Sequence, residues 1–157
     1  MAILRYNTLL KPDIGNTTPQ VIINCIGIVK QNPLINNITL TIELNSLFPH
    51  NLNNICREIN CRLIQLSSDC VFSGKRGFYN EMDSPEPIDI YGRSKLLGEI
   101  NNENCITIRK SVIGHELNSK KGLLEWFLAQ KNKVDGYKKA IFSGLTVQEL
   151  ARVIDFY

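Results

Sequence analysis

The sequence predicts an α/β fold built around a parallel sheet, and two observations carry that prediction. Short apolar runs of strand length alternate along the 157 residues with longer stretches in which apolar residues recur at three- and four-residue intervals. The first run is continuously apolar, which is typical of a parallel strand covered on both faces. Strands and helices that alternate in this order form parallel sheets with helical crossovers.

Three short apolar runs are the expected strands, at residues 21–26, 63–66 and 106–108. Helices are expected at residues 33–60, from Tyr91 onward, at residues 123–130 and from Thr146 to the end of the chain. Pro49 should kink or restart the first helix. Asp89 is a suitable N-cap for the second helix, and Thr146 with Glu149 fits a capping box for the last. The loop over 72–89 is long enough to be functional.

A tyrosine and a lysine four residues apart lie at the start of the second helix. Tyr91 and Lys95 therefore share one helix face. A phenol titrates near ~10, and an ammonium group held close to it favours phenolate and lowers its pKa. Such a tyrosine can protonate a carbonyl oxygen while a hydride reaches the carbon. Ser68, just after the second strand, is placed to hydrogen-bond the same oxygen. The spacing alone also fits a plain amphipathic helix.

Two motifs around these residues resemble the extended short-chain dehydrogenase/reductases, and in particular the dTDP-4-dehydrorhamnose reductase family. The motifs are Ser67-Ser68-Asp69-Cys70-Val71-Phe72-Ser73-Gly74 and Tyr91-Gly92-Arg93-Ser94-Lys95-Leu96-Leu97-Gly98-Glu99. Ser68 stands where the family has Thr, which keeps the hydroxyl group. The resemblance covers residues 19–156. It implies NAD(P)H-dependent reduction of a 4-keto-6-deoxy sugar nucleotide in surface polysaccharide biosynthesis.

The resemblance also implies a role for individual residues. Tyr91 matches the family's proton donor and Lys95 its partner, which also binds the nicotinamide ribose. The residues assigned to catalysis are Tyr91, Lys95, Ser68 and Asp69. Contacts with NADPH or NADH are expected from Cys25, Ile26, Gly27, Asn45, Tyr91, Lys95 and Ser111. Contacts with the sugar nucleotide are expected from Ser68, Asp69, Val71, Arg109, Val112 and Ile113. Family members often carry Trp where Val112 stands, so the sugar is left open.

The sequence lacks the Gly-rich turn that normally holds a dinucleotide's pyrophosphate. Its 10 glycines form neither Gly-x-x-Gly-x-x-Gly nor Gly-x-Gly-x-x-Gly. By resemblance, the fold is a partial Rossmann-like doubly wound parallel sheet without the N-terminal Gly-rich βαβ unit. We expect residues 1–110 to form an incomplete NAD(P)-binding domain and residues 111–157 part of a small sugar-nucleotide-binding lobe, in a single continuous domain.

Three functions therefore stay open. The first is the reductase activity that the motifs indicate. The second is an inactive fragment, or a non-catalytic regulatory or binding module with a reductase-like fold. The third is a sugar-nucleotide epimerase or dehydratase that uses the same tyrosine and lysine. Cofactor affinity distinguishes the first two functions, and a homodimer is one assembly that the resemblance allows.

Composition argues against several other classes. The net charge is only +3, without interleaved aromatic and basic residues, which disfavours nucleic-acid binding. No apolar run approaches the ~20 residues of a membrane span, and residues 1–8 lack a signal-peptide core, so a cytoplasmic location is expected. The odd number of cysteines, without a Cys-x-x-Cys pair, predicts neither disulfides nor a metal site.

Several single residues have more than one interpretation. Four cysteines lie in or beside apolar runs and are expected to be reduced and buried: Cys25, Cys61, Cys70 and Cys105. His115 is expected to form a surface hydrogen bond rather than to act as an acid. Trp126 falls in the apolar stripe of its helix, so we expect it in the core rather than stacked on a ligand.

Overall fold

Residues 19–116 and 122–156 are described by a computed structural model of the chain. The chain divides into two units, Met1–Arg109 and Lys110–Tyr157. The described part of the first unit contains a three-stranded sheet, and that of the second contains a pair of two-residue strands. Among the described residues, no helix is both long enough and apolar enough to cross a membrane.

The sheet of the first unit is parallel, as the sequence predicted. Its strands are β1 (Val21–Asn24), β2 (Arg62–Leu66) and β3 (Cys105–Ile108), in the order β1-β2-β3. The first strand ends two residues earlier than expected. Its last residue, Asn24, accepts a hydrogen bond from the Ile26 amide through Oδ1 at 3.0 Å, and this side-chain turn replaces the next ladder bond.

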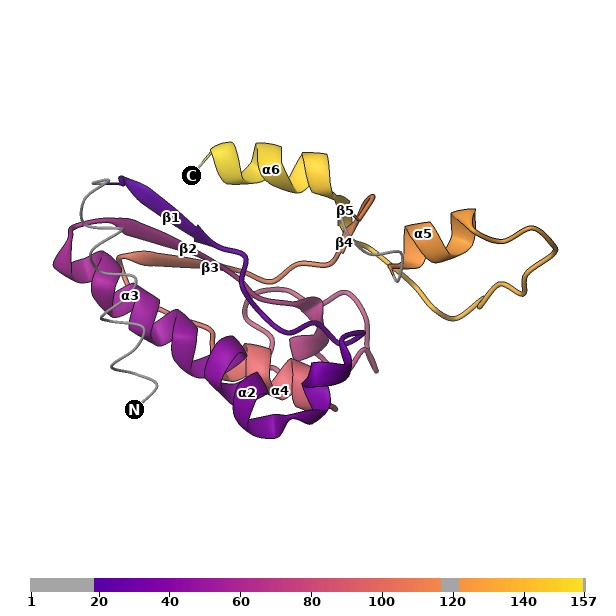
Figure 1. The fold of residues 1–157 in the computed structure, drawn as a ribbon, viewed down its shortest axis with the longest axis horizontal. Coiled ribbons are helices and arrows are strands. Elements are labelled where there is room, and N and C mark those ends of the chain that lie inside the picture. Colours follow the sequence, from indigo (N-terminus) through magenta and orange to yellow (C-terminus); the bar gives the residue numbers. More distant parts are fainter. Residues whose placement is uncertain (1–18, 117–121, 157) are drawn as a thin grey trace. The chain divides into compact units, whose positions relative to one another are not determined.

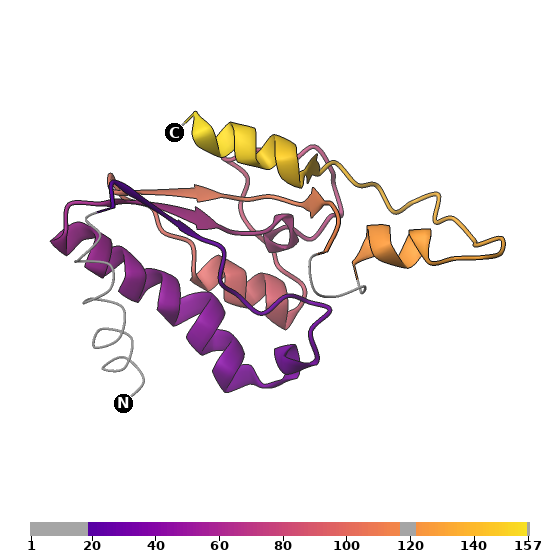
Figure 2. The same ribbon diagram turned by 45° about the horizontal axis from the view of Figure 1, so that its top comes forward.

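The described part of the first unit contains six helical segments. They are η1 (Pro33–Asn36), α2 (Ile38–Ile42), the π-helical turn η2 (Glu43–Leu47), α3 (Phe48–Glu58), η3 (Asp69–Val71) and α4 (Ile90–Leu97). Figures 1 and 2 show α3 and α4 on the same side of the strands. The core between them is a cluster of buried apolar residues: Phe48, Leu52, Cys56, Cys61, Leu63, Ile100 and Cys105.

The expected burial of the first strand on both faces is wrong. Val21 and Ile23 are 40% and 46% exposed, whereas Ile22 packs against the core cluster. β1 is the outer strand of the described sheet, and alternate residues of a strand point to opposite faces. Only one of its faces is therefore covered by the helices of this unit. Cys25, just beyond the strand, is exposed as well, contrary to expectation.

The long helix expected over residues 33–60 is divided at Asn37 and changes to a π-helical turn just before Pro49. The π-helical turn η2 leads directly into α3, and Pro49 occupies the first turn of α3. Proline has no backbone N–H to donate to the carbonyl four residues earlier, which here belongs to Asn45. The end of α4 comes close to that carbonyl at Gly98. The π-helical turn η2, which contains Asn45, and Gly98 thus belong to one packing contact.

Replacing Gly98 with Ala should destabilise the chain by about 1–3 kcal/mol, the usual cost of overpacking. A Cβ atom at this position would overlap the backbone oxygen of Asn45. Urea unfolding measures the loss. Gly136→Ala is the matched control, because a Cβ atom there meets nothing within 4 Å. Equal unfolding midpoints for the two variants would contradict this packing.

The second unit contains two strands that the sequence pattern did not reveal. β4 (Val112–Ile113) pairs in parallel with β5 (Leu145–Thr146), and helices α5 (Leu123–Leu128) and α6 (Val147–Asp155) complete the described part of the unit. Thr146 caps α6 as predicted, since its hydroxyl accepts a hydrogen bond from the Glu149 amide at 3.1 Å.

The expectation that Trp126 lies in the core is wrong, because its side chain is 44% exposed. The helix that carries it, α5, has only six residues, and none of them is buried in the described structure. An apolar stripe predicts burial only when another element packs against it.

Candidate active site

The segments just beyond the carboxyl ends of β1 and β2 carry six of the residues to which the sequence assigned chemistry. In open parallel sheets, ligands bind beyond this edge. The Ser67 amide donates to the Ile108 carbonyl at 2.8 Å and so extends the pairing of β2 with β3 by one bond. Ser68 then caps η3 by accepting from the Cys70 amide at 3.1 Å, and its hydroxyl donates to Asp69 Oδ1 at 3.2 Å.

Tyr91 reaches this edge from the first turn of α4. Asp89 caps the helix as predicted, accepting from the Gly92 amide at 2.8 Å. The phenol of Tyr91 lies close enough to the Ser68 hydroxyl for Ser68 to lower its pKa. Gly92 permits this approach, because a Cβ atom there would overlap the carbonyl oxygen of Cys70. The structure thus brings together two hydroxyl groups that lie 23 positions apart in the sequence.

The expectation that the pKa of Tyr91 is lowered is wrong for this structure. Burial of the phenol raises its pKa and is the largest influence, since the charged form loses hydration. The Ser68 hydroxyl lowers it, and the negative charges of Cys70, Asp69 and Asp89 raise it further. The phenol therefore carries its proton at neutral pH, which is the state that a proton donor needs.

Lys95 lies one helical turn beyond Tyr91 and is only 7% exposed. Its ammonium group donates a hydrogen bond of 2.6 Å to the carbonyl of Leu66, the last residue of β2. A Cβ atom at Gly27 would lie 3.7 Å from this ammonium and 3.0 Å from Asn45 Oδ1. The loop after β1 therefore passes close to Lys95 where glycine leaves room.

Asn45 is fully buried and fixes that loop to α4. Its Oδ1 atom accepts from the Ile28 amide at 2.7 Å. Its Nδ2 atom donates to the Ile28 carbonyl and to Ser94 Oγ, each at 3.0 Å. The side chain projects from the π-helical turn η2, and such turns are frequent at functional sites. Its contact with a cofactor stays a prediction, but its contacts with the chain show a positioning role.

The remaining predicted site residues fall into four groups. Cys25 and Ile26 are exposed at the end of β1. Val71 is completely buried, so its side chain offers no surface to a ligand in this structure. Arg109 is paired with Glu99 through a 2.8 Å contact. The last group belongs to the second unit and is half-buried there: Ser111, Val112 and Ile113.

One residue near Tyr91 was missed by sequence reasoning. Lys30, in the loop after β1, contacts Asp89 Oδ2 at 2.6 Å, and the hydrogen bond to Asp89 raises the pKa of Lys30. The charges of Cys70 and Tyr91 also raise this pKa. Sequence reasoning could have found Lys30 from its position in the loop that follows a predicted strand. His115, in contrast, forms the expected surface contact, with Glu125 Oε1 at 2.7 Å.

These residues fit one end of a nicotinamide dinucleotide. The exposed loop at Cys25 and Ile26, the room at Gly27 and the ammonium of Lys95 lie at the strand ends, where the nicotinamide ring and its ribose would bind. Among the described residues, no group of three His, Cys, Asp or Glu side chains is arranged to hold a metal ion.

Replacing Lys95 with Met should raise the pKa of Tyr91 further and weaken NADPH binding. The substitution removes a positive charge that favours phenolate and a hydrogen-bond donor near the cofactor. The pH–rate profile of an active preparation and calorimetric titration with NADPH measure the two effects. Lys95→Arg retains the charge, and Lys131→Met controls for the loss of an exposed lysine. An unchanged profile together with unchanged affinity would exclude both roles.

The chain has a dTDP-4-dehydrorhamnose reductase-like extended short-chain dehydrogenase/reductase fold, with Ser68 just beyond β2 and with Tyr91 and Lys95 on helix α4. The chain belongs to the family of the RmlD substrate binding domain, whose family model matches residues 7–135.

Three similar proteins define the extent of the match. Methionine adenosyltransferase 2 subunit beta of Xenopus laevis is 32% identical over 108 residues, which are 66% of this chain and 32% of that protein. A dTDP-4-dehydrorhamnose reductase of Bacillus anthracis, solved in complex with NADP, is 27% identical with a TM-score of 0.63, covering 71% of this chain and 42% of its own. The corresponding enzyme of Clostridium acetobutylicum has a TM-score of 0.80 at 22% identity, over 95% of this chain and 55% of its own. The chain thus spans about a third to about half of the length of these relatives.

Proposed function

We propose that this chain is the part of an NAD(P)H-dependent sugar-nucleotide reductase that protonates the substrate's carbonyl oxygen. The substrate would be a 4-keto-6-deoxy sugar nucleotide, used in surface polysaccharide biosynthesis. The observation that carries the proposal is the placement of Ser68 just beyond β2 and of Tyr91 and Lys95 one helical turn apart on α4, with Lys95 bonded to the last carbonyl of β2. Family membership and the NADP-bound relative support the same chemistry.

Three residues of the chain would have separate roles in this reaction. Tyr91 holds a proton at neutral pH, because burial raises its pKa, and would donate it to the oxygen at C4 of the sugar. Ser68 would hydrogen-bond the same oxygen and stabilise its developing charge. Lys95 would lower the pKa of Tyr91 in the assembled site, because a nearby cation favours phenolate. When bound, the reduced nicotinamide supplies the hydride that C4 accepts.

Asn45 and Asp89 would keep this geometry in place without touching the reacting atoms. Asn45 holds the loop after β1 against α4 through three hydrogen bonds of 2.7–3.0 Å. Asp89 caps the helix that carries Tyr91 and pairs with Lys30. A carbonyl group placed between Ser68 and Tyr91 would therefore meet two hydroxyl groups whose backbone supports are already fixed.

The proposal is tested by mixing the protein with NADPH and a dTDP-linked 4-keto-6-deoxy sugar and following NADPH oxidation. Substrate-dependent oxidation supports a reductase. The chain spans only part of its relatives' lengths, so the assay uses the shortest polypeptide containing this chain that is active. If no polypeptide containing this sequence oxidises NADPH with any keto sugar nucleotide, the proposal fails.

A second function has its own support. The Xenopus relative is named as a subunit of a methionine adenosyltransferase, so a protein of this kind can be part of an enzyme with a different activity. This chain would then be a binding module that joins another enzyme. Such a module would form a stable complex with its partner and would not need Tyr91, so Tyr91→Phe would leave the complex intact.

A further inference from the structure

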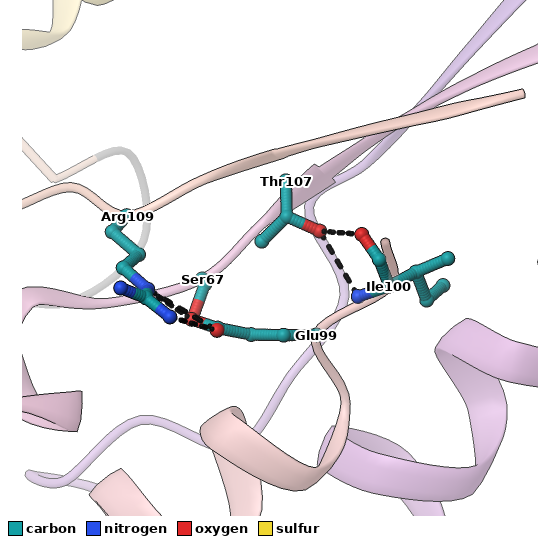
Figure 3. Close-up of polar contacts among 5 residues, drawn as sticks. All are labelled: Ser67, Glu99, Ile100, Thr107 and Arg109. Atoms are coloured by element: carbon teal, nitrogen blue, oxygen red, sulfur yellow. Dashed lines mark hydrogen bonds and ion pairs between the residues drawn. The ribbon is translucent and has the colours of Figure 1, made fainter. Parts of the chain in front are cut away.

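Glu99, directly beyond the end of α4, joins the ends of two strands. Its carboxylate accepts from Arg109 Nε at 2.9 Å and 3.1 Å and from Arg109 Nη2 at 2.8 Å. The hydroxyl of Ser67, which follows β2, donates to Glu99 Oε1 at 2.6 Å. Figure 3 shows the three side chains pointing toward one another. We call Ser67, Glu99 and Arg109 the strand-end clasp.

The clasp is strong enough to hold its parts in one geometry. Two-pronged arginine–carboxylate pairs are the most directional ion pairs in proteins. The side chains of Arg109 and Glu99 are largely shielded from solvent, which reduces screening. The hydrogen bond to Glu99 raises the pKa of Arg109, so the guanidinium group stays charged. The clasp therefore differs from an ordinary surface ion pair.

The backbone next to Glu99 is held by hydrogen bonds that do not involve the Glu99 side chain. Thr107 Oγ1, on β3, accepts from the Ile100 amide at 3.1 Å and donates to the Ile100 carbonyl at 2.9 Å (Figure 3). The chain after α4 is thus attached to β3 by both backbone groups of one residue. Changes in the Glu99 side chain should leave this attachment in place.

Arg109 also reaches the loop beyond η3. Its guanidinium group lies over the ring of Phe72, 5.1 Å from the ring centroid. Phe72 stacks on Tyr79 at a centroid distance of 4.5 Å, and the guanidinium group of Arg76 lies over the Tyr79 ring, 5.1 Å from its centroid. Such cation–π contacts are attractive, because the face of an aromatic ring carries partial negative charge. The clasp is therefore continuous with the loop over residues 72–89.

The two ends of one short segment are held by the same arginine–glutamate pair. Ser67 contacts Glu99 at one end, and Phe72 contacts Arg109 at the other. Ser68 and Asp69 lie between them. We propose that Glu99 is a positioning residue, which sets Ser68 against Tyr91 by holding both ends of this segment through Ser67 and Arg109. The expected effect of Glu99 on catalysis rests on the proposed function. The hydrogen bonds of Glu99 with Ser67 and Arg109 do not depend on it.

The test replaces Glu99 with Gln, which keeps the shape of the side chain but removes the charge that binds Arg109. The chain is labelled with 3-fluorotyrosine, whose phenol titrates at lower pH than that of tyrosine. The titration of Tyr91 is followed by fluorine NMR, and its signal among those of the five tyrosines is assigned with Tyr91→Phe. This measurement needs neither cofactor nor substrate.

We expect Glu99→Gln to raise the pKa of Tyr91 by about 0.4–1, which corresponds to the net free energy of one neutral hydrogen bond. Loosening Ser68 weakens the contact that lowers this pKa. Glu149→Gln is the control, since it removes an exposed ion pair with Arg152 at 3.0 Å and should leave Tyr91 unchanged. In an active preparation, Glu99→Gln should lower kcat about tenfold and leave the KM for NADPH unchanged.

An unshifted Tyr91 titration in folded Glu99→Gln would overturn the positioning role. Ser67→Ala, which removes only the hydroxyl group that meets Glu99, provides a milder variant and should shift the titration in the same direction. If Arg109→Lys raises the KM for the sugar nucleotide alone and leaves the titration unchanged, Arg109 acts on the substrate and the inference is wrong. Absence of NADPH oxidation together with a shifted titration would contradict only the proposed function.

Discussion

Replacing Tyr91 with Phe should lower kcat by about 10²- to 10⁴-fold, the usual contribution of a positioned proton donor. The variant keeps the aromatic ring, so the packing of α4 against η3 should persist. It loses the hydroxyl group, which lies near Ser68. The measurement is substrate-dependent NADPH oxidation by the shortest active polypeptide that contains this chain, with and without the substitution.

Tyr137→Phe is the matched control, because this tyrosine is exposed in the second unit. It should retain the parent rate. Circular dichroism of both variants separates loss of activity from loss of fold. A Tyr91→Phe protein that turns over at nearly the parent rate would exclude this tyrosine as the proton donor.

The 157-residue chain by itself should bind NADPH about 10²- to 10⁴-fold more weakly than a complete reductase such as the Bacillus anthracis enzyme. A Gly-rich turn and the helix after it supply backbone N–H donors to the pyrophosphate. Hydrogen bonds to charged groups contribute roughly 1.5–3 kcal/mol each, so the loss of two accounts for this range. Calorimetric titration of both proteins under one set of conditions gives the ratio.

The same chain should also self-associate. β1 is the outer strand of the described sheet, and its exposed residues Val21 and Ile23 are apolar. An unpaired apolar strand edge favours pairing with another chain. Analytical ultracentrifugation over a range of concentrations measures the association. A monodisperse monomer that binds NADPH with micromolar affinity would show that the missing turn and the open edge matter less than we infer.

Sequence patterns predicted the first unit better than the second. The three strands and the caps at Asp89 and Thr146 were predictable, because apolar periodicity and capping chemistry act over a few residues. The two-residue strands β4 and β5 were not, since two residues carry no period. The burial of Trp126 was wrongly predicted because burial depends on what packs against a helix, which the helix's own sequence does not contain.

The candidate site shows the same limit. The spacing of Tyr91 and Lys95 predicted that they share a helix face, and the motif placed Ser68 near them. The direction of the Tyr91 pKa could not be predicted, because it depends on burial and on charges from distant parts of the chain. Arg109 was predicted to contact substrate, and its pairing with Glu99 became visible only in three dimensions.

The most direct test of the account is the fate of the hydride. The active polypeptide is given NADPH carrying deuterium at the transferred position, together with the 4-keto-6-deoxy sugar nucleotide. We predict that the product sugar gains one deuterium, at C4, and that Tyr91→Phe slows this transfer by about 10²- to 10⁴-fold. Product that forms without deuterium would identify an epimerase or dehydratase cycle and contradict the account. A keto sugar that stays unreacted, with a protein that forms a stable complex with another enzyme, would also contradict the account.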